Sequence, residues 1–244
     1  MSDSSRYIQI STKFRTNKND STTDCRIELP TILRSGLYRL VYFLFPNTIS
    51  TINDNNNRIY ITELGKEPVV CAIYNGFYTY DTLINAVEDA INRKLSGYTV
   101  EYDDVKRKMS IKSGGAEFKL TFDQKNDDCH EIIGFNDVDT HYAVQHRSSG
   151  VVNLEPIHLI NVSIDNINSI SQQLLHSATF VIPIMSDVFG YTNYVPEINF
   201  NQTMYVQTDK RVISLKLTDE QHRSVDLNNS NYMLILEKID SGAC

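Results

Sequence analysis

The residues best suited to chemistry lie in one acidic stretch, residues 127–131, which reads Asp-Asp-Cys-His-Glu. A thiol, an imidazole and carboxylates are the groups of a cysteine nucleophile with its base, or of a metal site. Nucleophilic catalysis needs the base beside the thiol, whereas neighbouring residues of an extended chain point to opposite faces. We therefore favour the alternative interpretation, a solvated acidic turn before the apolar residues 132–135.

Two further groups of polar residues follow. Asp137, Asp139 and His141 occupy alternate positions, so in a strand they would share a face and could hold a cation. The sequence places no further ligand, and the same residues suit a polar exit from the central region. His146 and Ser148 suggest a serine–histidine pair, but no acid stands at a motif spacing and the following Ser-Gly is typical of a loop.

Established catalytic and phosphate-binding motifs do not occur in the sequence. It contains no Gly-x-Ser-x-Gly, Gly-x-x-x-x-Gly-Lys, Gly-x-Gly-x-x-Gly or His-Glu-x-x-His pattern. We therefore predict no catalytic residues, no cofactor and no metal site, and a protein that is not an enzyme.

A different kind of candidate site comes from the aromatic residues, which comprise 14 Tyr and 10 Phe. Most alternate with polar residues at strand spacing and are predicted to be core. The exception is a segment between Pro183 and Pro196, predicted as a long loop. Exposed tyrosine gives a large contact area at low entropic cost, so this loop is either a contact surface or packed internally. The candidate contact residues are Phe189, Tyr191, Asn193 and Tyr194.

Composition limits the classes of protein. The chain has 244 residues, with 23 Lys+Arg against 30 Asp+Glu and a net charge of −7, which disfavours a generally basic nucleic-acid surface. Five basic residues near the start hint at an inward-facing N-terminal end, but nearby aspartates favour a solvated strand face. These are Arg6, Lys13, Arg15, Lys18 and Arg26.

Hydrophobic residues make up 41% of the chain. The apolar run at residues 40–45 is far shorter than the ~20 residues of a membrane span, so none is expected. The first six residues lack the apolar region of a secretory signal. The four cysteines are widely separated without any Cys-x-x-Cys, which favours reduced thiols in a cytosolic setting. They are Cys25, Cys71, Cys129 and Cys244.

Strand patterns dominate both ends of the chain. Alternating or continuous apolar residues predict strands at 8–14, 25–29, 37–45, 151–154, 157–164, 179–184, 204–207, 211–218 and 232–239. The run 37–45 is nearly all apolar, which predicts a strand covered on both faces. A turn at residues 54–57 predicts a hairpin between 49–52 and 58–62.

The middle of the chain has a different pattern. Apolar residues at helical spacing predict a helix over 82–95, with Thr79 or Asp81 as N-cap and Gly97 after its end. Strands follow at 98–102, 108–112 and 118–122. Strands on both sides of a compact α+β module predict a β-sandwich interrupted by an insertion. The predicted domains are a discontinuous sandwich, residues 1–76 and 136–244, and an inserted α+β domain, residues 77–135.

Several segments together resemble a family of proteins. They are Leu29-Pro30 with residues 36–41, then 76–83, 98–103 and 133–135, then 213–219, 225–229 and 233–236. The first group resembles an early jelly-roll strand, the second the inserted module, and the third the closing strands of penton and minor capsid proteins. Those proteins come from virophages, polinton-like viruses and related large DNA viruses of eukaryotes.

The resemblance implies a single jelly roll that forms homopentamers at icosahedral capsid vertices and contacts the major capsid protein. The inserted module would be available to a fibre or a host receptor, and the family has no catalytic residues to transfer. The implied location is the virion, assembled in the host cytoplasm or a viral factory. The alternatives are a minor cement or spike-base protein and a lectin-like attachment jelly roll that binds glycans or a receptor.

Overall fold

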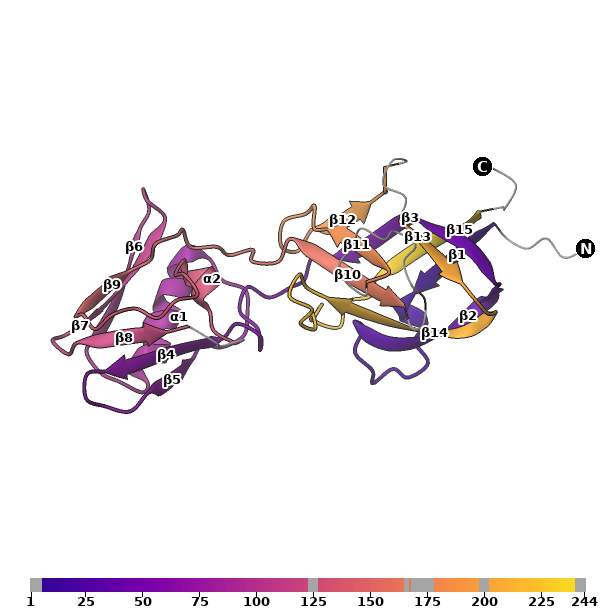
Figure 1. Cartoon of the computed structure of the whole chain (residues 1–244). Helices are drawn as coiled ribbons and strands as arrows, with labels where there is room; N and C mark the ends of the chain where they lie inside the picture. The colour runs from indigo at the N-terminus through magenta and orange to yellow at the C-terminus, as the bar shows by residue number, and fades with distance from the viewer. Residues whose placement is uncertain (1–5, 123–126, 165–166, 168–177, 198–201, 240–244) are drawn as a thin grey trace, which may run out of the picture. The chain divides into compact units, whose positions relative to one another are not determined.

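The chain divides into two compact units. The structure is a computed structural model that describes residues 6–122, 127–164, 167, 178–197 and 202–239. One unit combines Met1–Ile49 with Ile157–Cys244, and the other is the continuous stretch Ser50–Pro156. The two ends of the colour scale, indigo and yellow, accordingly lie in the same unit, while magenta fills the other (Figure 1).

Two antiparallel sheets form the first unit. Its strands are β1 (Tyr7–Ser11), β2 (Asp24–Leu33), β3 (Gly36–Pro46), β10 (Leu159–Ile164), β11 (Phe180–Pro183), β12 (Tyr191–Tyr194), β13 (Thr203–Val206), β14 (Lys210–Thr218) and β15 (Met233–Ile239). One sheet has the order β1-β15-β3-β12, with β13 also paired to β3, and we call it sheet A. The other, sheet B, has the order β11-β10-β14-β2. A 3-10 turn, η1 (Thr12–Phe14), follows β1.

The pairing of these strands is nested. The first strand, β1, pairs with the last, β15, and β2 pairs with β14. Further in, β3 pairs with β12 and β13, and β10 pairs with β11. A hairpin rolled up in this way, with its strands divided between two facing sheets, is a jelly roll. The predicted fold class, a single jelly-roll β-sandwich interrupted by a small α+β insertion, is confirmed.

Alternation along β3 shows how the sequence specifies the sandwich. Tyr38, Leu40, Phe43 and Phe45 are buried between the sheets. The register shifts opposite β15 just before Tyr42, which inserts an extra residue and restores the inward direction of Phe43. Residues on the outer face are only half-buried, so the prediction of a strand covered on both faces is wrong. Neighbouring strands on each side, rather than a second layer, shield those side chains.

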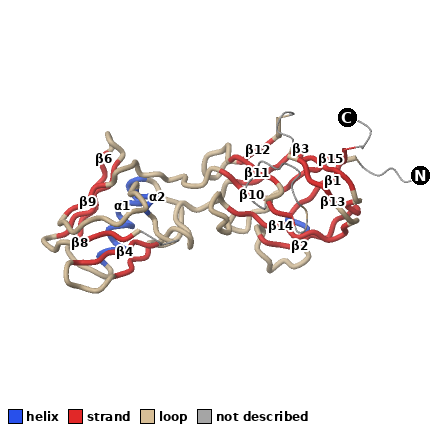
Figure 2. The backbone as a smooth tube through the Cα atoms, in the orientation of Figure 1, coloured by secondary structure: helices blue, strands red, loops and turns tan. Residues whose placement is uncertain are grey.

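The inserted unit has its own elements and its own core. They are β4 (Arg58–Glu63), β5 (Val69–Ala72), α1 (Tyr80–Asn92), β6 (Tyr98–Asp103), β7 (Lys108–Ser113), β8 (Phe118–Thr121), α2 (His130–Ile133) and β9 (Gln145–Arg147). The sheets have the orders β5-β4-β8 and β6-β7-β9. Figure 2 shows α1 in blue against the red strands of this unit.

The helix α1 follows its predicted pattern closely. It buries Leu83, Val87, Ala90 and Ile91 in the core of the inserted unit. Thr79 is the N-cap, and its side chain accepts a hydrogen bond from the Thr82 amide. The helix ends at Asn92, three residues earlier than predicted, and the left-handed Gly97 then leads into β6. Within the described ranges, neither α-helix combines the length and apolarity needed to cross a bilayer.

The boundaries of the inserted unit differ from the predicted 77–135. β4 pairs with β5 and β8, so residues 58–72, predicted to belong to the sandwich, are part of the inserted unit. The predicted hairpin between 49–52 and 58–62 is also wrong, because Ile52 instead exchanges backbone hydrogen bonds with Gly76. At the other end, residues 151–154 form no strand, and Val152 is buried in the core of the inserted unit.

We expect Phe118→Ala to destabilise the inserted unit by about 3–5 kcal/mol. Phe118 is fully buried, with its ring 5.1 Å from that of Tyr98 and 4.7 Å from that of His146. Urea unfolding of the full chain measures the change. The control Val105→Ala, at a side chain that is 93% exposed, should change stability by less than about 0.5 kcal/mol. Equal effects of the two variants would contradict the described core.

Candidate contact surface

The predicted contact residues lie at one edge of sheet A. Tyr191, Asn193 and Tyr194 belong to β12, which pairs with β3, and Phe189 precedes it. The expectation of a long loop is therefore wrong for most of these residues, because they continue the ladder of β3. Phe189 is 66% exposed and Tyr191 is 65% exposed. Whether these residues make contacts with a partner remains a prediction.

The turn into β12 is held by backbone hydrogen bonds to the end of β3. The amide of Phe189 donates to the Asn47 carbonyl at 2.7 Å, and the Asn47 amide donates to the Gly190 carbonyl at 2.8 Å. Phe189 has a φ of 66°, in the left-handed region that side-chain-bearing residues rarely adopt. A Cβ on Gly190 would lie 2.9 Å from the Asp187 carbonyl oxygen, so the close turn requires glycine. The backbone conformation of this turn therefore holds Phe189 in its exposed position.

The four predicted residues divide into two groups. Asn193 is exposed, and its Oδ1 accepts a hydrogen bond from the Tyr42 hydroxyl at 2.7 Å. Tyr194 is only half-buried and packs against the core of the jelly roll. Its hydroxyl accepts a hydrogen bond from Nε2 of Gln202 at 2.9 Å, and the same amide group donates to the Val181 carbonyl. Tyr194 therefore links the two sheets, and internal packing is the better description of its role.

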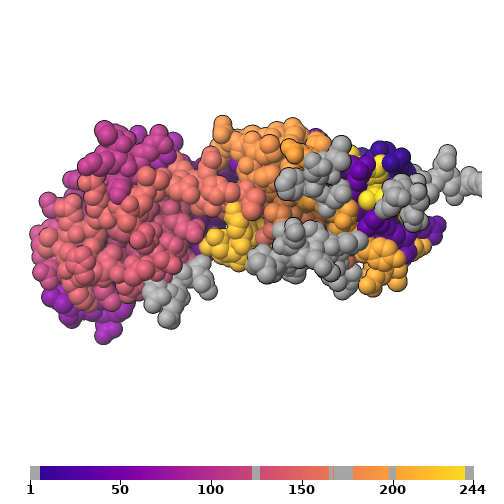
Figure 3. Space-filling view, turned by 45° about the horizontal axis from the view of Figure 1, so that its top comes forward, coloured from indigo at the N-terminus to yellow at the C-terminus, as the bar shows by residue number. Residues whose placement is uncertain are grey.

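Sequence reasoning missed three exposed apolar residues on the same side of sheet A. Met185 and Val195 flank β12, and Tyr205 projects from β13. Each of them is an apolar residue that interrupts the alternation of a strand or follows its end. From the sequence alone such a residue is easily assigned to the core. We name the set Met185, Phe189, Tyr191, Val195 and Tyr205 the aromatic edge. The orange segment that contains β12 forms part of the surface of the jelly roll in Figure 3.

The aromatic edge also has a distinctive charge. No lysine or arginine occurs between Arg147 and Lys210. Asp187 and Glu197 are exposed beside the edge, and neither forms an ion pair with any residue that the structure describes. Tyrosine, phenylalanine and methionine are enriched in protein interfaces, so the apolar composition of the aromatic edge agrees with the predicted contact role, which stays a prediction.

The acidic stretch at residues 127–131 is internally paired. The His130 Nδ1 donates to Oδ1 of Asp128, whose side chain is buried. This hydrogen bond raises the pKa of His130 above its usual value. Cys129 is fully buried in the core of the inserted unit, and burial raises the pKa of its thiol. A buried protonated thiol is a poor nucleophile, which disfavours a catalytic cysteine. The predicted solvated acidic turn is also wrong, because Asp128 and Cys129 are buried and His130 begins the short helix α2.

The possible cation ligands do not converge. Asp139 accepts a hydrogen bond from the Phe122 amide at 2.9 Å and lies 3.5 Å from the Lys119 ammonium. Within the ranges described, no three His, Cys, Asp or Glu side chains are positioned to hold a metal ion. Asp139 instead pairs with the end of β8, while Asp137 and His141 flank it in the polar exit segment.

His146 and Ser148 also have structural partners. The His146 Nε2 donates to the Phe118 carbonyl at 2.8 Å, and burial lowers the pKa of the imidazole. The Ser148 hydroxyl donates to the Gly150 carbonyl at 2.9 Å and accepts from the Met109 amide at 3.1 Å. These bonds join the segment to β7 and β8, so the geometry supports a structural role for both residues.

Comparisons with solved structures give matches over nearly the whole chain. No family model matches the sequence. No curated protein matches it either. Among solved structures, the chain is similar to the mavirus penton protein, with 13% identity and a TM-score of 0.47 over 96% of this chain and 99% of that one. That protein is a penton protein by name.

A second solved structure is far less similar. The D1-D2-D3 domains of the flagellar cap protein FliD from Escherichia coli give a TM-score of 0.16 at 12% identity. The alignment covers 96% of this chain and 57% of that one.

The His130–Asp128 pair predicts a pH dependence of stability. Because the folded-state pKa of His130 is raised, the pair stabilises the fold fully below the unfolded pKa of about 6.5, and this contribution is lost as pH rises through the folded pKa. Urea unfolding between about pH 5.5 and pH 8.5 should show this loss, and His130→Gln should remove it. His158→Gln, at an exposed histidine, is the control and should keep the wild-type profile.

The buried cysteines predict slow alkylation of the folded protein. Burial raises the pKa of Cys25 and of Cys71 to about 11, and Cys129 is buried as well. Because the thiolate is the reactive form, iodoacetamide near neutral pH should leave these three unmodified until guanidinium chloride unfolds the chain. Peptide mass spectrometry reads out each site separately. Rapid modification of Cys129 in the native protein would contradict its burial. Cys244 lies outside the described residues.

Proposed function

We propose that this chain is a virion structural protein, a penton that forms homopentamers at the vertices of an icosahedral capsid and contacts the major capsid protein. The observation that carries the proposal is the nested strand pairing of a jelly roll whose third and fourth strand positions, β3 and β10, are separated by an independent unit. Jelly rolls are a recurrent architecture of capsid proteins. The sequence resemblance to penton and minor capsid proteins supports the same role.

A ring of identical protomers needs surfaces that stay available in the folded monomer. The aromatic edge supplies one, because its apolar side chains are exposed although the core of the jelly roll is closed. Each copy carries a net charge of −7, so ring formation must overcome mutual repulsion through local contacts. Exposed apolar area and locally unpaired charge are the two means by which protein interfaces do this.

The inserted unit has a separate part in the proposal. Its core includes residues from α1, β4, β7 and β8 and contains none of the jelly-roll strands. A unit with its own core can vary its surface without disturbing the jelly roll. We assign to it the contact with a fibre or a host receptor. The proposed location is the virion, with assembly in the host cytoplasm or a viral factory.

The proposed role is structural and not catalytic. Each residue group that suggested chemistry has a partner inside the fold: His130 with Asp128, Asp139 with the end of β8, and His146 with the Phe118 carbonyl. Such bonds stabilise the segments that connect the strands of the inserted unit. Their positions explain why reactive residue types are present in a protein whose proposed task is assembly.

Measurement of the mass in solution tests the proposal. We expect light scattering on the recombinant chain to give five times 27.9 kDa above a threshold concentration, and the monomer below it. Cryo-electron microscopy of particles formed with the major capsid protein should then show density of this chain at the vertices. A monomer at every concentration, with another protein at the vertices, would refute the penton role; density elsewhere on the capsid would indicate a cement or spike-base protein.

A second candidate, a lectin-like attachment protein, is favoured by the exposed ring of Tyr191 beside Asn193. Aromatic rings with adjacent amide groups are the usual surface for sugar stacking and hydrogen bonding. A glycan array with the wild-type chain tests it, with Tyr191→Ala as the variant that should lose any signal. The matched control is Tyr205→Ala, at an exposed tyrosine on β13. An array without signal would remove this candidate and leave the penton proposal unaffected.

A further inference from the structure

We propose that neighbouring copies of this chain join head to tail, with a basic edge of one jelly roll against the aromatic edge of the next. The inference rests on the proposed function, because it names the two surfaces through which the ring would form. The basic edge consists of the exposed side chains of Lys13, Phe14, Lys18 and Arg26 around η1 and β2. The aromatic edge is accompanied by the exposed carboxylates of Asp187 and Glu197.

Strand order places these surfaces at opposite ends of the same sandwich. In sheet A, β1 is the strand at one end and β12 is at the other, with β13 on the same side of β3 as β12. In sheet B, β2 and β11 occupy the two ends. The Arg15 bridge to Ile27 joins the segment after β1 to β2, and Gln202 bonds the backbone of β11 from beside β13. Each end is therefore formed by both sheets together.

The basic edge has charges that are not neutralised by an ion pair, although the Lys18 ammonium donates a hydrogen bond to the Lys13 carbonyl. Among described residues, Lys13, Lys18 and Arg26 form no ion pair. Phe14, between two basic residues, is 64% exposed, so this edge also offers an apolar contact. Residues 13–26 contain four basic and two acidic residues, which leaves the edge positive.

Other arginines of the jelly roll differ, because they form ion pairs within the chain. Arg6 and Arg39 both pair with the buried carboxylate of Glu237, at 2.6 and 2.5 Å. Arg34 pairs with Asp209 at 2.8 Å, in the turn before β14. Charge left over after folding is thus separated, positive at the β1–β2 end and negative at the β11–β13 end.

This separation selects a second copy as the occupant and determines the geometry of the contact. Two aromatic edges brought face to face would oppose Asp187 and Glu197 with the same carboxylates, and two basic edges would oppose cations. Contact between unlike edges instead neutralises both charges and buries Phe14 together with the aromatic edge. Such a contact is heterologous, since each copy uses two different surfaces. Heterologous contacts close into rings when the rotation between copies allows it.

Charge reversal of the full-length chain tests the inference. We expect Asp187→Lys with Glu197→Lys, and separately Lys13→Glu with Lys18→Glu, to raise the concentration at which the ring forms by about tenfold or more, because each places like charges across the contact. The chain that combines all four substitutions should form rings near the wild-type concentration, because its charges are complementary again. Light scattering across a dilution series measures each threshold.

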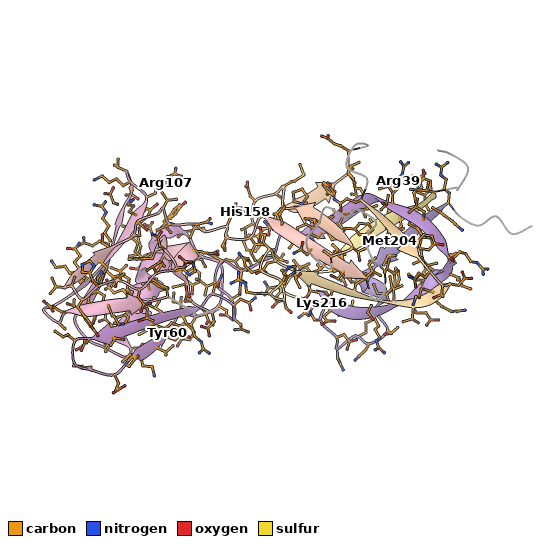
Figure 4. The ribbon with its side chains drawn as sticks, in the orientation of Figure 1. Arg39, Tyr60, Arg107, His158, Met204 and Lys216 are labelled. Carbon is orange, nitrogen blue, oxygen red and sulfur yellow. The ribbon has the colours of Figure 1, made fainter. Side chains whose placement is uncertain are left out.

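The control is Arg107→Glu, which reverses an exposed charge of the inserted unit that belongs to neither edge (Figure 4). It should assemble like the wild type. Urea unfolding of every variant verifies that it is folded. The milder double variant Asp187→Asn with Glu197→Gln should also raise the concentration at which the ring forms, but by a smaller factor.

The outcomes separate the inference from the proposed function. A wild-type chain that never forms rings refutes the proposed function itself. Wild-type rings whose threshold is unchanged by either reversed pair refute the inference and leave the penton role standing. Loss of assembly in both reversed pairs without recovery in the combined chain would show that these edges do not face each other, which also overturns the inference.

Discussion

The antiparallel pairing of β3 with β15 is the interaction on which the rest of the structure depends. β3 is the last strand before the inserted unit, and β15 is the last strand described in the chain. Their ladder runs from Leu37 to Leu44 and places Phe43 and Phe45 in the core. It also supports β12 and β13 on the far side of β3, so the aromatic edge exists only when this ladder has formed.

The insertion between β3 and β10 does not disturb this ladder, because the inserted unit buries its apolar residues without help from the jelly-roll strands. Its apolar residues form a separate core, and the helix α1 covers the outer edge of β6 with side chains. The Val100 amide donates to Glu88, and the Tyr98 backbone exchanges two hydrogen bonds with Asn92. A covered strand edge is protected against pairing with other chains. The entropic cost of closing a long connection also grows only slowly with its length.

Charge in the jelly roll follows from the same arrangement. Glu237 lies on the central strand β15, and Arg6 and Arg39 from neighbouring segments pair with its carboxylate. Although burial acts to raise the pKa of Glu237, hydrogen bonds from Arg39 and Tyr7 lower it below its usual value. Towards the two ends of the sandwich, Lys13, Lys18, Asp187 and Glu197 form no ion pair with any described residue. The β1–β2 end therefore keeps a net positive charge and the β11–β13 end a net negative charge, which a second copy could neutralise.

Much of this architecture could be predicted from local pattern. The stripe of Leu83, Val87 and Ile91 predicts α1 because helical spacing is a property of consecutive residues, and alternation predicts most strands for the same reason. Which strands pair is a long-range property that alternation does not encode: residues 58–72 read equally well as sandwich strands, and only their pairing with β8 assigns them to the inserted unit. Likewise, composition identified Phe189 and Tyr191 as contact candidates. Tertiary structure alone separated them from Tyr194, because burial depends on which neighbours the fold brings to a side chain.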